Sequence, residues 1–391
     1  MNPHRGESFS QLAITHVLAF QFRLQQPFYA GLPFRVRCHV IPFKNIIIIN
    51  DVILIDNEMC NHHIRCNNTG YDDMQHFLLS SKARSISLKA VFTMGEDKAY
   101  KTFCDMRWPE NDGEAVCPRC GCVEVYGIAT RRKFKCVACH HQFSVTSGTI
   151  FASRKMSFTD LLAAIVIFVN GAKGIAALQL SRDLDCQYKT AFVLTHKLRE
   201  AMRREMAGRQ LDGIVEIDGA YFGGYSKPEN RKEDRKDRRL KANLTGKRQC
   251  VVIMRERGGK SLPFIVRNEG DAVPFVRDHV GTLTTIMADE GTGWDALHAG
   301  WDTRRINHSV AFSDEGACTN QAESYFSRLR RMEVGTHHHI AGPYLNAYAG
   351  EASWREDNRR TDNGAQAGMV AMAAMGSRVS RQWKGYWQRA G

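Results

Sequence analysis

The chain has 391 residues, which predicts two or three domains with ample material for a core, since a domain takes roughly 100–200 residues. Hydrophobic residues make up 43% and charged residues 24% of the sequence, a composition that excludes disordered and fibrous proteins. There are 54 Lys and Arg against 41 Asp and Glu, a formal net charge of +13. Such an excess favours a polyanionic partner, nucleic acid above all.

The sequence lacks the features of a membrane or secreted protein. Its longest apolar runs, 46–49 with 52–55 and 161–169, are shorter than the ~20 residues of a membrane span. The first residues do not follow the order of a signal peptide. Of the twelve cysteines, four fall in one tight pattern and eight are scattered, which indicates a metal site and free thiols rather than a disulfide framework. We therefore expect a cytoplasmic protein with no membrane partner.

The first 113 residues divide at Met74. Residues 1–73 hold six basic and six acidic residues, so the whole positive excess belongs to residues 74–391. They match no pattern that we can connect to a function; one interpretation is a start codon assigned too far upstream, and the alternative is a poorly structured leader. From Met74 to Trp108 apolar residues recur at helical spacing, which predicts one or two short helices in a segment 74–113.

A metal-ligand pattern follows at 114–155. Cys117 and Cys120 are separated by two residues, and after fifteen more residues Cys136 and Cys139 repeat that spacing. Zn²⁺ is bound by four tetrahedral thiolates, and each Cys-x-x-Cys turn brings two of them to one ion. The pattern predicts a structural zinc ribbon; three nearby residues that break the paired spacing rank below the four as ligands, namely Cys122, His140 and His141.

Basic residues cluster between the two cysteine pairs. We predict that this group contacts DNA phosphates, although a solvated charged face is the alternative. Its members are Arg131, Arg132, Lys133 and Lys135.

Residues 156–208 are expected to be helical and to resemble a helix-turn-helix. Ser157 with Asp160 three residues later is typical of a helix start. Helices at 174–180 and 188–204 are separated by a break at 181–185. The start of the second helix would meet base edges, through Gln187, Lys189 and Thr190; a helical hairpin without DNA is the alternative.

From residue 209 to 365 the pattern changes to short β-branched runs. Strands are predicted at 214–218, 249–254, 262–266 and 284–288, with a helix at 271–280 before the last of these and further helices after it. This order predicts an α/β domain with a mixed sheet flanked by helices.

Three carboxylates lie at positions in that domain where an active site is expected. Asp218 and Asp289 are expected at the carboxyl ends of central strands, where open α/β sheets place their active sites. Glu323 lies in a helical stretch with Asn320 one turn before and Arg330 two turns after it, on one helix face. Such a set can hold two Mg²⁺ ions, or Mn²⁺, about 4 Å apart for in-line phosphoryl transfer. Glu216, on the same strand face as Asp218, is a reserve ligand.

Several segments then carry a resemblance to a known family: QHFLLS, CPRCG, CVACHHQFSVTSGTIF, EIDGAYFGG, LTGKRQ, ADEGTGWDALH, RINHS, ACTNQAESYFSRLRR and HHHIAGPYLNAYAGEASWREDNRR. Residues 74–391 resemble bacterial insertion-sequence transposases of the DDE type with an amino-terminal zinc ribbon, the ISXO-like group. The resemblance implies a ribonuclease H-like catalytic domain whose triad falls on Asp218, Asp289 and Glu323. It further assigns the family's helix Asn to Asn320 and its basic residue to Arg330.

The sequence thus predicts a nucleoid-associated bacterial DNA transposase that binds terminal inverted repeats and joins them to target DNA with Mg²⁺, and that carries structural Zn²⁺. Arg328 and Arg331 are expected to add DNA contacts. Because two ends must meet, we expect a homo-oligomer on DNA and no small-molecule substrate. Two alternatives stay open: a zinc-ribbon transcriptional regulator, and a structure-selective nuclease of the same fold. Residues 366–391 form a tail to which the sequence assigns no function.

Overall fold

The computed structural model describes residues 77–223, 229–236, 248–307 and 318–389, and the backbone of two short strands, β1 (Ile48–Ile49) and β2 (Val52–Ile53). The chain forms two units, Met1–Gly70 and Tyr71–Gly391. In the first, β1 pairs antiparallel with β2; the interpretations of residues 1–73 otherwise concern residues outside the described ones. Within the described residues, no helix is both long enough and apolar enough to cross a bilayer.

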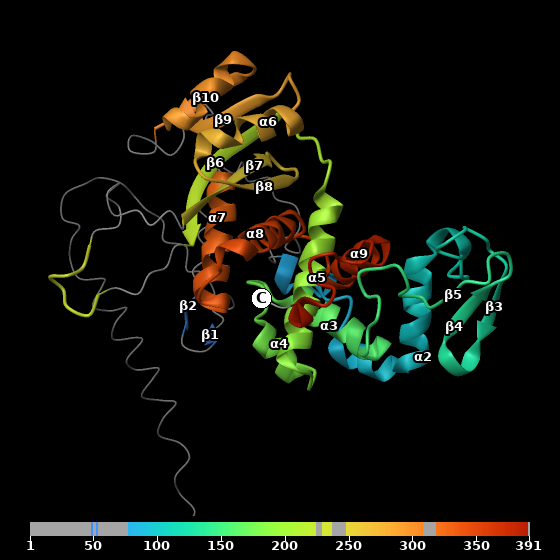
Figure 1. Ribbon diagram of the computed structural model, residues 1–391. Coiled ribbons are helices and arrows are strands. Elements are labelled where there is room, and N and C mark those ends of the chain that lie inside the picture. The colour runs from blue at the N-terminus through green and yellow to red at the C-terminus, as the bar shows by residue number, and fades with distance from the viewer. Residues whose placement is uncertain are drawn as a thin grey trace, which may run out of the picture. The chain divides into compact units, whose positions relative to one another are not determined.

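A helix and a small sheet open the second unit (Figure 1). After the short turns η3 (Phe77–Leu79) and η4 (Ser81–Ala83), α2 (Leu88–Arg107) begins where the Ser87 side chain accepts a hydrogen bond from the N–H of Ala90. At Gly95 the backbone is not helical (φ 75°, ψ 169°), so α2 consists of two short helices that meet at a kink, as the sequence predicted. A three-stranded antiparallel sheet follows η5 (Pro109–Asn111), in the order β3 (Val125–Ile128), β4 (Lys133–Cys136) and β5 (Gln142–Phe143), with η6 (Ala129–Arg131) between the first two.

Three helices connect this sheet to the larger one. α3 (Phe158–Asn170) begins as predicted, with Ser157 accepting from the N–H of Asp160, and its nearly all-apolar sequence is buried against α2 and α9 (Asn363–Gly376). α4 (Ala177–Asp183) and α5 (Tyr188–Met206) pack together across a four-residue connection, 184–187. The helix pair predicted from the sequence is therefore present.

The larger sheet has five strands in the order β10-β9-β6-β7-β8. Their bounds are β6 (Ile214–Gly223), β7 (Arg248–Glu256), β8 (Ser261–Val266), β9 (Thr285–Asp289) and β10 (Asp302–Ile306). β7 is antiparallel to β6 and β8, whereas β9 and β10 run parallel to β6. This order and these directions form a ribonuclease H-like mixed sheet, so the predicted fold class is confirmed.

The sequence did not predict β10. Its sequence, Asp-Thr-Arg-Arg-Ile, has three charged residues and a single apolar one, so it lacks the apolar run by which the other strands were identified. The turn η9 (Thr292–Ala299) lies between β9 and β10, and η8 (Glu269–Ala272) with α6 (Val273–His279) lies between β8 and β9.

Helices cover both faces of the larger sheet (Figure 1). One face packs α7 (Asn320–Met332) and α8 (Gly342–Asp357) against side chains such as Val251 and Ile253. The opposite face packs α6 and η9 against the alternate positions, such as Val252 and Met254. A π-helical turn, η10 (Glu333–His337), and a 3₁₀ helix, η11 (Tyr386–Gln388), complete the described elements. Residues 216, 218, 220 and 222 of β6 therefore belong to the α7 face, because side-chain direction alternates along a strand.

A buried ion-pair triad joins the helical segment to α8. Glu351 accepts from Arg199 of α5 at 2.6 Å and from Arg355 at 2.9 Å. Arg355 also donates to the carbonyl oxygens of Phe168 and Val169 at the end of α3. Burial alone would raise the pKa of Glu351, but the two guanidinium groups hold it at about 2. The triad thus fixes α3, α5 and α8 against one another.

His196 lies beside this triad with an unusual environment. Its side chain is 1% exposed, and both ring nitrogens are buried without a hydrogen-bond partner. Burial lowers its pKa to about 3, aided by Arg199 and His337 and opposed by Glu351. The folded protein therefore holds His196 neutral.

We expect His196→Phe to reduce the acid sensitivity of the protein. The unfolded chain binds a proton at His196 below about pH 6.5 whereas the folded chain does not, so this group makes the protein lose stability as pH falls from 6.5 towards 3. Between pH 7.5 and 5 the loss amounts to about 2 kcal/mol, which Phe should abolish. Urea unfolding at both pH values measures it. The same replacement at the exposed His298 is the control, and an unchanged pH dependence in His196→Phe would contradict the account.

Candidate zinc centre and active site

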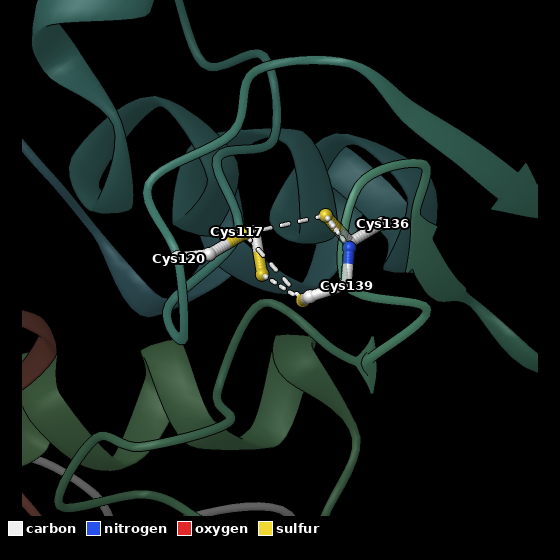
Figure 2. Close-up of side chains that lie close together, drawn as sticks. All are labelled: Cys117, Cys120, Cys136 and Cys139. Atoms are coloured by element: carbon white, nitrogen blue, oxygen red, sulfur yellow. Dashed lines mark hydrogen bonds between the residues drawn. The ribbon is translucent and has the colours of Figure 1, made fainter.

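Four cysteines converge at the base of the small sheet (Figure 2). Their Sγ atoms all lie within 4.8 Å of one another, the only such group of three or more metal-binding side chains among the described residues. Sγ–Sγ distances are 3.6 Å for Cys117–Cys139, 3.5 Å for Cys120–Cys136 and 3.4 Å for Cys120–Cys139. These values are close to the ~3.8 Å edge of a tetrahedron with Zn–S bonds of about 2.3 Å, and far from the ~2.05 Å of a disulfide. The cysteines fit one Zn²⁺.

The electrostatics of the cluster also fit a cation. The backbone N–H of Cys139 points at the Cys136 sulfur, 3.5 Å away, and with the N–H of Ala138 it lowers the pKa of Cys136 to about 6. The N–H of Cys122 lowers the pKa of Cys120, but the sulfurs of Cys139 and Cys136 outweigh it and raise that pKa to about 12. Crowded thiolates resist full ionisation unless a metal ion compensates their charge.

The substitute ligands lie outside the cluster. The Cys122 thiol donates to the carbonyl oxygen of Glu124, and the His141 ring stacks on Phe143. Trp108 contacts both Phe134 and Phe143, so the cysteine cluster sits on an aromatic core continuous with α2.

The basic residues between the cysteine pairs separate into two groups. Arg131, Lys133 and Lys135 are exposed. Arg132 instead forms ion pairs with Glu96 and Asp97 of α2, at 3.2 and 2.6 Å. Its role in the described structure is to hold the small sheet to α2, which the sequence could not reveal because the partners are 36 and 35 residues away.

Asp218 and Asp289 meet on neighbouring strands. Asp289 ends β9 as predicted, but the expectation that Asp218 ends its strand was wrong, since β6 continues to Gly223 to pair with β7. Pairing of β6 with β9 stops at Ile217 opposite Ala288. The next residues in register are the two aspartates. Backbone N–H groups of Gly219 and Gly291 donate to them at 2.7 and 3.1 Å.

The charges around Asp218 strongly perturb it. Burial is the largest cause that raises its pKa, Asp289, Glu269 and Glu323 add to it, and the hydrogen bond from Gly219 opposes them; the resulting pKa is about 7. Four carboxylates therefore share one electrostatic environment. Three of them are the residues that the sequence predicted.

Glu269 is the member that sequence reasoning missed. It lies three residues after β8, which runs in the same direction as β6 because both are antiparallel to β7. A Cβ atom on Gly219 would lie 2.4 Å from the Glu269 Cγ atom, so only glycine at this position lets the Glu269 side chain pack so closely against β6. Burial, and then Asp289, raise the pKa of Glu269. Its position just beyond the end of β8 is the sequence feature that could have identified it as a site residue.

α7 carries the remaining predicted site residues. Asn320 is its first residue, Glu323 is exposed one turn later, and Arg330 is exposed with its guanidinium 5.9 Å from the Phe326 ring. The four described carboxylates do not converge as tightly as the cysteines.

Glu216 positions this helix. Its carboxylate is 0% exposed, accepts from the N–H groups of Gln321 and Ala322 at 2.8 and 3.1 Å, and pairs with Arg257 at 2.9 Å. A strand of the sheet thereby caps the amino terminus of α7. The expectation that Glu216 is a reserve metal ligand is corrected: its oxygens are already committed to the helix that carries Glu323.

We expect Glu216→Ala to lower the free energy of unfolding by about 2–4 kcal/mol, because a helix cap contributes ~1 kcal/mol and loss of a buried ion-pair partner more. The replacement should also shift Glu323 relative to Asp218, and any activity that depends on both carboxylates should fall. Denaturant unfolding measures the stability, and Glu110→Ala, at an exposed carboxylate, is the matched control. Equal stability of the two variants would refute the capping role.

The predicted DNA contacts of the helices lie in two environments. Gln187, Lys189 and Thr190 are exposed at the start of α5. Arg328 pairs with Glu356 at 2.7 Å and donates to the carbonyl oxygen of Ala172, so it ties α7 to the connection between α3 and α4. Arg331 is exposed and bonds to Ser327 within its own helix.

Two protein families match this chain. Residues 94–142 match the family described as the transposase zinc-ribbon domain, and residues 210–357 match the ISXO2-like transposase domain. Similar solved structures include the crystal structures of the Mos1 strand transfer complex and of a pre-cleavage Mos1 transpososome. Each is 10% identical over 55% of this chain and 78% of the other, with TM-scores of 0.21 and 0.14. A search of curated proteins found no match. The family of residues 94–142 supports a structural Zn²⁺ on the four cysteines.

Proposed function

Because the chain belongs to the ISXO2-like transposases with an amino-terminal zinc ribbon, we propose that it binds the terminal inverted repeats of an insertion sequence and cuts and joins DNA by Mg²⁺-dependent phosphoryl transfer. The triad of this reaction is Asp218, Asp289 and Glu323. The partners are the element ends and the target DNA, and the active form is a homo-oligomer that holds two ends.

The shared electrostatic environment of Asp218 is the observation that carries this proposal. Burial, together with the charges of Asp289, Glu269 and Glu323, raises its pKa to about 7. Such a concentration of negative charge is costly without a cation, and carboxylate oxygens are the donors that Mg²⁺ prefers. Because these carboxylates do not converge as tightly as the four cysteines, they suit a pair of ions about 4 Å apart rather than one ion. Bound there, Mg²⁺ or Mn²⁺ would activate the attacking oxygen and stabilise the leaving one.

The residues around the triad bind and orient the DNA. Arg330 is exposed on the helix that carries Glu323, two turns further along, where it would neutralise a phosphate next to the reacting one. Asn320 shares the face of Glu323 and would hold a DNA oxygen by hydrogen bonding. Arg131, Lys133 and Lys135 of the ribbon would contact the backbone of the element ends. Arg132 and Arg328, being paired within the chain, serve mainly to hold these parts in place.

The test is an assay of cutting and joining. The full chain is mixed with labelled DNA that carries the element's own ends, and with a supercoiled target, in Mg²⁺. We expect end-specific 3′ cleavage and products joined to the target. Cutting without joining or end preference would favour a structure-selective nuclease, and specific binding without cutting would favour a transcriptional regulator; either result would overturn the proposal.

A further inference from the structure

The carboxyl-terminal segment 377–389 is held firmly in place. Trp383 is 3% exposed, and its ring stacks on His196 with centroids 4.3 Å apart. The Ser380 hydroxyl accepts from the N–H of Trp383 at 2.9 Å, and Arg204 of α5 donates to the carbonyl oxygen of Arg378 at 3.0 Å. The Tyr386 hydroxyl bonds to that of Tyr344. These contacts fix the backbone of the segment against α5 and α8.

The segment presents only positive charge to solvent. After Asp362 the described chain contains no further acidic residue. Four basic side chains are exposed, and among the described residues none of them forms an ion pair with a carboxylate: Arg378, Arg381, Lys384 and Arg389. The Arg389 guanidinium donates to the carbonyl oxygens of Arg381 and Lys384, which curls the segment and holds the charge of Arg389 against the backbone of those two residues. Uncompensated cations gathered in this way suit a polyanion.

The same segment adjoins the first turn of α5. Trp387 is 45% exposed, and the ammonium group of Lys189 lies 5.4 Å from its ring centroid. Phe192, one turn along α5, contacts both Tyr386 and Trp387, at 6.0 and 5.8 Å between centroids. Trp387 thus restricts the position of Lys189 through a cation–π contact. The segment therefore runs along α5, from Arg204 near the carboxyl end of that helix to Lys189 in its first turn.

We propose that residues 377–389 and the first turn of α5 form one DNA-binding surface. Arg378, Arg381 and Lys384 contact the phosphates of the element-end duplex, while Trp387 is a positioning residue that orients Lys189 towards it. The inference rests on the proposed function for the identity of the DNA. It adds to that function a phosphate-binding tail, in a part of the chain beyond residues 210–357 that match the transposase domain.

The salt dependence of binding tests this surface. Fluorescence anisotropy measures the affinity of the full chain for a duplex with the terminal repeat, and for a scrambled duplex, over a range of salt concentrations. The tail variant combines Arg378→Gln, Arg381→Gln and Lys384→Gln. The control removes the same charge from other exposed positions, by Lys82→Gln, Lys89→Gln and Lys98→Gln.

Each lost phosphate contact should lower the slope of log affinity against log salt by about 0.9, so the tail variant should lose about 2–3 in slope and bind both duplexes more weakly. The control should keep its slope, because Lys82, Lys89 and Lys98 are not part of the proposed surface and only charges that neutralise phosphates release counterions. Equal slopes in the tail variant and the wild type would overturn the inference and leave the proposed function standing. Absence of DNA binding by the wild type would overturn both.

A double-mutant cycle tests the role of Trp387. Trp387→Ala should weaken DNA binding several-fold in the wild type but have little further effect in Lys189→Gln, since it acts through Lys189. Unchanged thermal midpoints would show that folding is preserved. Additive losses would contradict the positioning role and would assign Trp387 a separate contact.

Discussion

Asp289→Asn should abolish both end cleavage and joining, with a rate at least ~10³-fold below that of the wild type. Metal-assisted charge stabilisation contributes several kcal/mol to such reactions, and each 1.4 kcal/mol is about tenfold in rate. The substitution is isosteric and keeps an oxygen that can accept from the N–H of Gly291. DNA binding and the thermal midpoint should therefore stay close to those of the wild type.

A matched control separates this effect from a general loss of surface charge. Asp302 lies on the neighbouring strand β10 with a side chain 60% exposed, and it pairs only with Arg304 among the ion pairs of the described residues. Asp302→Asn should keep activity within about twofold, because exposed pairs of this kind contribute little. Rates are measured from the appearance of cleaved 3′ ends in single-turnover conditions. Similar activity of Asp289→Asn and the wild type would remove Asp289 from the catalytic residues.

Cys136→Ser should remove the zinc and unfold the ribbon. Structural Zn²⁺ contributes an apparent ~10–16 kcal/mol to small cysteine sites, far more than such a small sheet can supply by burial. Cys136 is fully buried on β4, the strand that also carries Phe134, so loss of the metal should also loosen the aromatic contact of Phe134 with Trp108. We expect metal analysis to fall from one zinc per chain to none, with rapid hydrogen exchange over residues 114–143.

Cys122→Ser is the control for this experiment. Cys122 follows Cys120 by two residues, but its thiol donates to the carbonyl oxygen of Glu124 and lies outside the cluster. The control should retain its zinc and its slow exchange. Retention of zinc by Cys136→Ser, or its loss from Cys122→Ser, would show that the four-cysteine assignment is wrong.

The parts of the fold that the sequence predicted are those specified by local patterns. The paired cysteines need only their own turns to meet, and the apolar runs at 214–218, 249–254 and 262–266 each formed a strand. β10 was missed because its sequence is polar and its place is set by pairing with β9. Sheet order and register are long-range properties that periodicity does not contain.

The roles of individual charged residues were harder to predict for the same reason. Glu216 shares a strand face with Asp218, as the sequence indicated, yet its partners are backbone groups 105 and 106 residues away. Glu269 approaches Asp218 only because Gly219 has no side chain. In both cases the partner is chosen by tertiary packing, so residue type and spacing identified the carboxylates but could not separate a metal ligand from a helix cap.

Manganese binding tests the central claim most directly, because it reports on the carboxylates without requiring catalysis. Electron paramagnetic resonance counts the Mn²⁺ ions held by the full chain in complex with element-end DNA. The account predicts saturable binding by the wild type and by Asp302→Asn, and its loss in Asp218→Asn and Asp289→Asn. The same Mn²⁺ binding in all four proteins would contradict a metal-dependent active site built on Asp218, Asp289 and Glu323.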